Sequence, residues 1–160
     1  MSGAAPMRLR VPRLLRAPAA ALALGWTLLL GAADFDYALQ PRRIADDTWV
    51  LTGRNEDFTL ANGGNIVNTA FVVTDAGVVV IDALGSPALA GRLLAEIRKL
   101  TPLPVTHVIV THYHADHIYG LQAFRNQGAR IIAHRSALEY LNSETARQRL
   151  ETSRIELAPW

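Results

Sequence analysis

The chain of 160 residues contains no cysteine. This absence excludes a disulfide framework and any metal site built from thiolate ligands. Imidazole nitrogen and carboxylate oxygen are the side-chain ligands that remain for first-row metals. Stability must then come from a hydrophobic core, and half of the residues are hydrophobic. The length suits one domain with a core of its own and is short for two.

Charged residues are also few, at 19% of the chain, yet the composition is not that of a disordered or fibrous protein. The excess of positive charge is confined to residues 1–33, which hold four arginines and no acid. The rest of the chain has 12 Lys and Arg against 14 Asp and Glu. We therefore expect no nucleic-acid partner. Internal repeats and low-complexity segments are absent as well.

A hydrophobic run long enough to span a membrane is missing. The apolar run Ala19–Leu30 is shorter than the roughly 18–20 residues that a spanning helix needs. A basic stretch precedes it and the small residues Gly31–Ala33 follow it, which is typical of a secretory signal. We expect residues 1–33 to be a signal peptide and the protein to be periplasmic or secreted. No membrane contact is expected after cleavage.

Strands and helices are predicted to alternate after an opening group of strands, which indicates an α/β chain with a mixed β-sheet. The predicted strands cover residues 44–52, 66–74, 77–82, 105–110 and 130–133. The apolar residues of 78–81 and 105–110 are continuous, so we expect these two strands to be buried on both faces. The sequence Asn62-Gly63-Gly64-Asn65 predicts a hairpin turn or a flexible loop.

Three helices are predicted between and after these strands. Ser86 and Pro87 supply the cap and the first residue of one helix, whose apolar stripe is formed by Leu89, Leu93, Ile97 and Leu100. A short helix is predicted from Leu121 to Gly128. Ser136 and Glu139 have the spacing of a capping box at the start of the last helix, on which Arg147 and Glu151 could pair.

Three imidazoles and one carboxylate occupy the six positions His112–His117, directly after a predicted strand. In an extended segment, His112 and His114 point the same way, and Asp116 and His117 then point to an adjacent position. Such a group can hold one or two metals, and Thr111 and Asp82 are candidates for fixing the imidazole tautomers. A structural zinc site is the alternative, although such sites are usually rich in cysteine.

The segment Thr111–His117 matches the HxHxDH signature of the metallo-β-lactamase superfamily, and the residues from 44 to 141 resemble that family's opening strands and helix. The resemblance implies the N-terminal half of an αβ/βα sandwich. It also implies that His112 and His114 bind a first zinc and that Asp116 and His117 bind a second. Asp116 would be catalytic, because it orients the attacking water and handles its proton.

The resemblance implies a zinc-dependent hydrolase that attacks an ester, thioester or lactam-like bond of a small molecule through metal-bound hydroxide. The stretch His112–Gly120, together with the secretory signal, is similar to that of the exported quinoprotein relay system zinc metallohydrolase group. The alternative is a non-hydrolytic metal-binding module, or an inactive truncated member, in a periplasmic quinoprotein oxidation pathway. No substrate-binding residue is identified, although Tyr113 and Tyr119 could line a pocket or simply pack.

The family completes each metal with ligands from the second half of its fold. After His117, the only further histidine is His134, which we expect to be structural or on the surface, as we do for His107. We therefore expect residues 34–160 to be an incomplete metallo-β-lactamase domain whose C-terminal half is missing. Self-association is expected as one way of covering the exposed edge of such a sheet.

Overall fold

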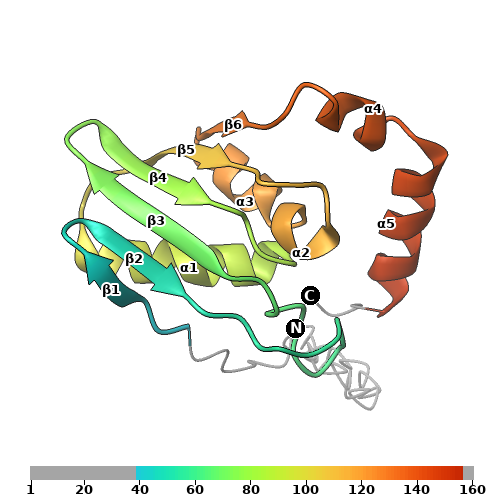
Figure 1. The fold of residues 1–160 in the computed structure, drawn as a ribbon, viewed down its shortest axis with the longest axis horizontal. Coiled ribbons are helices and arrows are strands. Elements are labelled where there is room, and N and C mark those ends of the chain that lie inside the picture. The colour runs from blue at the N-terminus through green and yellow to red at the C-terminus, as the bar shows by residue number, and fades with distance from the viewer. Residues whose placement is uncertain (1–38, 157–160) are drawn as a thin grey trace, which may run out of the picture. The chain divides into compact units, whose positions relative to one another are not determined.

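A computed structural model describes residues 39–156 (Figure 1). The predicted signal peptide, residues 1–33, lies outside the described residues. The described strands are β1 (Arg42–Ala45), β2 (Thr48–Leu51), β3 (Thr69–Thr74), β4 (Gly77–Ile81), β5 (Val105–Ile109) and β6 (Arg130–Ile132). The described helices are α1 (Pro87–Leu100), α2 (Ala115–Ile118), α3 (Leu121–Asn126), α4 (Ala137–Leu141) and α5 (Glu144–Glu156). None of these helices is long and apolar enough to cross a membrane.

The strands form one mixed sheet, in agreement with the predicted fold class. Their order in the sheet is β1-β2-β3-β4-β5-β6, the same as their order in the chain. The first four strands are antiparallel neighbours, whereas β4, β5 and β6 run parallel. Two-residue connections suffice for the hairpins β1–β2 and β3–β4, but the parallel pairs need crossovers. Helix α1 makes the first crossover, and α2 with α3 makes the second.

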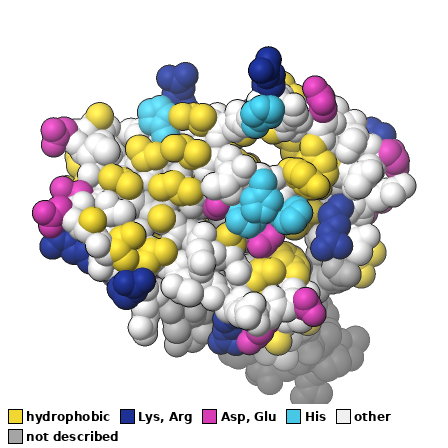
Figure 2. All heavy atoms as spheres, in the orientation of Figure 1, with side chains coloured by type: hydrophobic (Ala, Val, Ile, Leu, Met, Phe, Trp, Pro, Cys, Tyr) yellow, Lys and Arg dark blue, Asp and Glu magenta, His cyan; other side chains and the backbone are white. Residues whose placement is uncertain are grey.

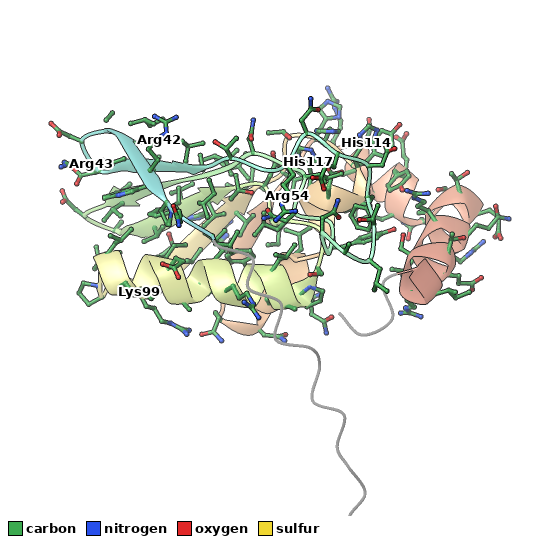
Figure 3. All side chains as sticks on the ribbon, turned by 90° about the horizontal axis from the view of Figure 1, so that it is seen from below. Arg42, Arg43, Arg54, Lys99, His114 and His117 are labelled. Carbon is green, nitrogen blue, oxygen red and sulfur yellow. The ribbon has the colours of Figure 1, made fainter. Side chains whose placement is uncertain are left out.

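Helix α1 begins as the sequence predicts. The Ser86 Oγ atom accepts a hydrogen bond of 3.2 Å from the Leu89 backbone N–H, and Pro87 is the first helical residue. The apolar stripe is buried at Leu89, Leu93 and Ile97. Leu100, the last residue of the stripe and of the helix, is 47% exposed. Seen from below, α1 lies along one face of the sheet (Figure 3).

The core lies between α1, α3 and the sheet. Its largest fully buried side chains include Phe71, Val80 and Val108, from three neighbouring strands, and Phe124 from α3. The Trp49 ring stacks on Phe71 with centroids 5.2 Å apart and planes inclined by 9°. Each fully buried aliphatic or aromatic side chain contributes about 1.5–3 kcal/mol to the free energy of unfolding, so these contacts supply much of the stability.

The opposite face of the sheet is only partly covered by the described residues, so the prediction that β4 and β5 are buried on both faces is wrong here. The strand register places five apolar residues side by side on this face, namely Val50, Ala70, Ile81, Ile109 and Ile132. Ile109 is 37% exposed and Ile132 is 49% exposed. Figure 2 shows hydrophobic side chains gathered over these strands. The continuous apolar residues of β4 and β5 predict that both faces of the sheet are packed against other elements. Among the described residues, helices pack against only one face.

Several predicted boundaries differ from the observed ones. Residues 44–52 form part of a hairpin rather than one strand, because the chain turns at Asp47, whose φ is 57°. Strand β3 begins at residue 69 rather than 66, since turns occupy residues 60–66. Helix α2 was not predicted. It forms a single turn inside the histidine-rich segment, where a loop is the natural expectation.

The C-terminal helices differ from the predicted ones in two details. The predicted capping box is wrong, because Ser136 has helical backbone angles and its side chain makes no capping hydrogen bond. The predicted pair of Arg147 with Glu151 is also wrong, since the Arg147 Nε atom donates a hydrogen bond of 3.1 Å to Glu144. Both errors concern exposed polar side chains, which can form contacts of similar free energy with several different partners.

A substitution at Gly120 tests how closely the chain after α2 packs against the residues after β4. A Cβ atom at this position would lie 1.9 Å from the backbone oxygen of Ala83. We expect Gly120→Ala to lower the free energy of unfolding by at least about 2 kcal/mol, in the upper part of the range for overpacked sites. Urea denaturation followed by circular dichroism measures this change.

The matched control is Gly91→Ala in helix α1, where nothing lies within 4 Å of the added Cβ atom. Removing a glycine from a helix interior raises stability by about 0.5–1 kcal/mol. Equal urea midpoints for the two variants would contradict the close approach of Gly120 to Ala83.

Candidate metal centre

The histidine-rich segment follows β5 at the carboxyl end of the parallel strands, where open α/β sheets place their sites. Two backbone hydrogen bonds attach it to the residues after β4. The Ala83 N–H donates to the His117 carbonyl at 2.9 Å, and the Gly120 N–H donates to the Leu84 carbonyl at 3.0 Å. A third bond, from Val110 N–H to the Ile132 carbonyl at 2.8 Å, attaches its start to β6.

The three imidazoles lie together. The ring centroids of His112 and His114 are 4.6 Å apart, and those of His112 and His117 are 3.9 Å apart. Figure 2 shows a group of histidine side chains at the surface beside acidic and hydrophobic neighbours. The sequence predicts that His117 points to an adjacent position with Asp116. In the structure, the turn of α2 brings His117 back against His112 as well.

Asp82 connects β4 to this segment. Its carboxylate is almost fully buried, with 4% of the side chain exposed. It accepts hydrogen bonds from the Thr111 backbone N–H at 2.9 Å and from the Thr111 hydroxyl at 2.8 Å. The His117 Nδ1 atom lies 2.8 Å from its Oδ2 atom. Asp82 and Thr111 therefore occupy the positions that the sequence suggests for groups that orient imidazoles.

These bonds determine which ring nitrogens stay available. Since the Thr111 hydroxyl donates to Asp82, its oxygen can accept from His112 Nδ1, which is 3.0 Å away. His117 likewise donates from Nδ1 to Asp82, and its Nε2 atom lies 3.4 Å from the Asp116 carboxylate. In both rings the Nε2 atom is left as the potential ligand. Metal-bound histidines usually have such a partner on their other nitrogen.

The charge state of His112 suits a ligand. Burial lowers the pKa of its imidazole below the ordinary value, and the neighbouring imidazoles of His117 and His114 lower that pKa further. The carboxylates of Asp82 and Asp116 act in the opposite direction. The net effect favours the neutral ring at neutral pH, and the neutral ring is the form that binds metals.

The donor types fit zinc, since imidazole nitrogens and a carboxylate are its usual ligands in the absence of cysteine. The structure brings His112, His114, Asp116 and His117 to one place. Within residues 39–156, however, no group of three or more histidine, cysteine or acidic side chains is arranged so that it could hold one ion. The four side chains therefore fit zinc by their donor types and by their closeness to one another. Their roles as metal ligands stay predictions.

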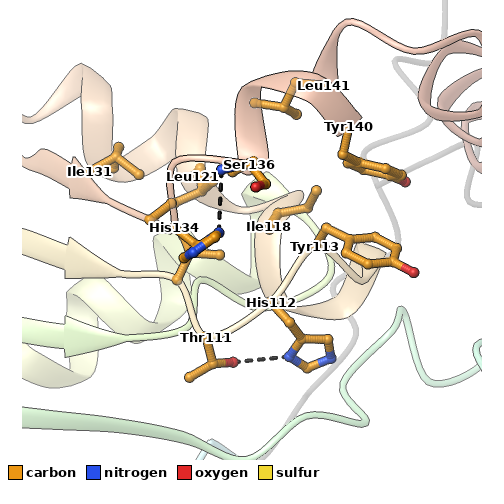
Figure 4. Close-up of a pocket in the computed structure, with 13 residues that line it drawn as sticks. Thr111, His112, Tyr113, Ile118, Leu121, Ile131, His134, Ser136, Tyr140 and Leu141 are labelled. Carbon is orange, nitrogen blue, oxygen red and sulfur yellow. Dashed lines mark hydrogen bonds between the residues drawn. The ribbon is translucent and has the colours of Figure 1, made fainter.

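The other two histidines lie apart from the cluster. His107 is a half-buried residue of β5 whose Nδ1 atom lies 3.1 Å from the Thr106 hydroxyl. His134 follows β6, and its Nδ1 atom accepts a hydrogen bond of 3.3 Å from the Ser136 N–H (Figure 4). Both positions agree with a structural or surface use.

The segment from Asn62 to Asn65 is a packed loop rather than a tight hairpin turn. The Asn62 Oδ1 atom accepts from the Thr59 and Gly64 N–H groups, each at 3.0 Å. The Asn62 amide donates to the Asp57 carbonyl at 2.7 Å. Phe58 packs directly on Gly64, leaving no room for a side chain there.

Two cavities adjoin the histidine cluster. One, of about 260 Å³, lies beside His112 and has mainly apolar walls (Figure 4). The other, of about 380 Å³, lies beside His114 and Asp116. Tyr113 lines both, whereas Tyr119 instead contacts Ser153 of α5, with 3.5 Å between their hydroxyl oxygens. Sequence reasoning missed Tyr140 and Arg149, which also line these cavities, because neither residue belongs to a recognisable motif.

Relatives among characterised proteins share part of this chain. It is 35% identical over 93 residues to a metallo-beta-lactamase type 2 of Bacillus sp., a match that covers 58% of this chain and 34% of that protein. It is 38% identical over 48 residues to a linear primary-alkylsulfatase of Pseudomonas sp., which covers 30% of this chain and 9% of that protein. The chain thus spans about a third of the first relative and less of the second.

Solved structures and a family model agree with these relatives. A metallo-beta-lactamase from Pontibacter korlensis superposes with a TM-score of 0.56 at 22% identity, covering 67% of this chain and 48% of that one. This likeness supports the fold. The family model described as the metallo-beta-lactamase superfamily matches residues 62–155, which is more than half of the chain. The protein therefore belongs to the metallo-beta-lactamase superfamily.

Proposed function

We propose that this chain carries the zinc-binding part of a hydrolase that cleaves an ester, thioester or lactam-like bond of a small molecule. Membership of the superfamily supports a metallohydrolase type of function. The observation that carries the proposal is the contact of three imidazoles beside Asp116, with two of the rings oriented by Asp82 and Thr111. A merely polar loop would not need a buried carboxylate such as Asp82 beside a histidine ring.

In this proposal, His112 and His114 hold one zinc, while Asp116 and His117 hold a second. Zinc held there would lower the pKa of a water ligand to about 7 and would polarise the bond to be cleaved. Asp116, which lines the cavity beside His114, would orient the attacking water and accept its proton. Asp82 and Thr111 act through the imidazoles, which they hold in one tautomer.

The second candidate is a metal-binding module without hydrolysis, acting in a periplasmic quinoprotein oxidation pathway. It draws on the same cluster of imidazoles as the first candidate. Such a module would bind zinc through the same residues but would turn over no substrate. Zinc affinity and hydrolysis must therefore be measured separately.

The first test removes one proposed ligand. We expect His114→Ala to lower zinc affinity by more than about a hundredfold, because even the loss of an outer partner costs 10–100-fold. Competition with a chromogenic chelator measures the affinity. Hydrolysis of a chromogenic β-lactam and of a thioester, followed by absorbance, should be abolished in this variant.

His107→Ala is the control for this test, since His107 lies outside the cluster. It should keep the zinc affinity and any hydrolysis of the original chain. Equal zinc affinity in the two variants would remove the cluster from metal binding. Zinc binding without turnover in the original chain would favour the second candidate.

The second test concerns the group that orients the rings. Asp82 has a φ of 63°, which asparagine also tolerates, so Asp82→Asn keeps the backbone while it removes the charged acceptor. We expect zinc affinity to fall by about 10–100-fold with little change in the circular dichroism spectrum.

The matched control is Asp47→Asn in the β1–β2 turn, where φ is 57°. Among the described residues, the contacts of the histidine cluster are with Asp82, Thr111 and Asp116 rather than with Asp47, so this variant should bind zinc like the original chain. Similar zinc affinities for the Asp82 and Asp47 variants would show that Asp82 does not position the ligands.

We also propose export to the periplasm, on the basis of the basic and apolar pattern of residues 1–33. A chain without these residues should stay in the cytoplasm of a bacterial host, whereas the whole chain should reach the periplasm and lose a segment ending near Ala33. Cell fractionation with mass spectrometry distinguishes the two. An uncleaved chain in the cytoplasm would contradict the proposal.

A further inference from the structure

We propose that the two cavities beside the histidine cluster form one binding site for a small molecule that carries an apolar group and an anionic group. The apolar group would enter the cavity beside His112, and the anionic group would bind Arg149 in the other cavity. This inference rests on the proposed function insofar as it names the class of substrate. The binding itself requires neither zinc nor hydrolysis.

The cavity beside His112 suits an apolar group. Its walls include Val110, Ile118, Leu121 and Leu141. Figure 4 shows Ile118, Leu141 and His112 among the residues around it. Its volume is about 260 Å³. An apolar cavity of about 150 Å³ is enough to bind benzene. The cavity can therefore take a ring with substituents or a short alkyl chain.

The cavity beside His114 and Asp116 contains a positive charge. Phe58 and Ile66 contribute from the loop between β2 and β3, and Arg149 contributes from α5. Among the described residues, no ion pair with a carboxylate is found for Arg149, whereas Arg147 on the same helix pairs with Glu144. Arg149 therefore has its donors available for a carboxylate or a sulfate, which it matches in geometry.

Tyr113 and Tyr140 are shared by the two cavities. Their ring centroids are 4.4 Å apart with planes inclined by 38°, and both residues line each cavity. Tyr113 also meets His114 edge to face, with centroids 5.2 Å apart. A ligand that lies across this pair would have its central bond next to His112 and His114. Tyrosine rings suit such a position, since they offer an apolar body and a polar tip.

The charges of the second cavity favour placing the anion at Arg149. Asp116 lines the same cavity, but its carboxylate has the same sign as the proposed ligand group and already lies 3.4 Å from His117 Nε2. Asp116 belongs to α2 and Arg149 to α5, so the two charges come from different elements. The apolar walls of one cavity and the positive charge of Arg149 in the other therefore suit different ends of a ligand.

The test uses two dyes of the same shape. 8-Anilinonaphthalene-1-sulfonate carries an aromatic group and an anion, and N-phenyl-1-naphthylamine is the same aromatic group without the sulfonate. Each is titrated against the full 160-residue chain without zinc, and fluorescence gives the dissociation constant. We expect Arg149→Gln to weaken binding of the sulfonate by about tenfold, the effect of one charged hydrogen bond, and to leave the neutral dye unaffected.

Arg154→Gln is the matched control, since Arg154 lies on the same exposed helix and does not line either cavity. It should bind both dyes like the original chain. Ala137→Trp tests the apolar cavity, because Ala137 lines it, and should weaken both dyes at least fivefold. Its control is Leu138→Trp, at a neighbouring residue that is 67% exposed and lies outside that cavity.

Equal sulfonate affinity in Arg149→Gln and Arg154→Gln would overturn the proposal, and would indicate that the dye binds elsewhere, such as the uncovered face of the sheet. Weakening of both dyes by Arg149→Gln would also contradict it, since the effect would then not depend on the anion. Because these measurements need no metal, their outcome is independent of the zinc and hydrolysis tests.

Discussion

The buried carboxylate of Asp82 holds together the parts of the molecule on which the candidate site depends. Thr111 donates to it from its backbone and its hydroxyl, and His117 lies against its other side. A buried carboxylate is stable only when such donors surround it. The end of β4, the start of the motif and helix α2 are therefore fixed relative to one another through one side chain.

This connection has a conformational cost. Asp82 and Leu84 both have positive φ values, of 63° and 69°, and Leu84 is fully buried. Each such residue costs on the order of 1–3 kcal/mol and persists only where its surroundings enforce it. The enforcing contacts are present, since the backbone between them bonds to His117 and Gly120 approaches Ala83 closely. Strain is concentrated where the histidine rings must be held.

The sequence allows the mixed sheet, helix α1 and the grouping of the histidines to be predicted, because periodicity, capping residues and a dense motif are local signals. The position of His117 against His112 could not be predicted, since it depends on the single turn of α2. Arg149 was missed for another reason. It is about 30 residues from the motif, and only the packing of α5 near Tyr119 and Tyr140 brings it to the cavity.

The strands lie in the sheet in the same order as in the chain, and this order affects how the protein folds. Each strand after the first adds to the edge left by its predecessor. The hairpins β1–β2 and β3–β4 close two-residue turns, whereas the other pairings close longer connections. Because loop closure costs more entropy for the longer connections, we expect the hairpins to form before the parallel pairs. The sheet can grow in one direction as the chain emerges from a ribosome or a translocation channel. The histidine segment receives its anchor to Ile132 only when β6 has joined, so its geometry is completed late.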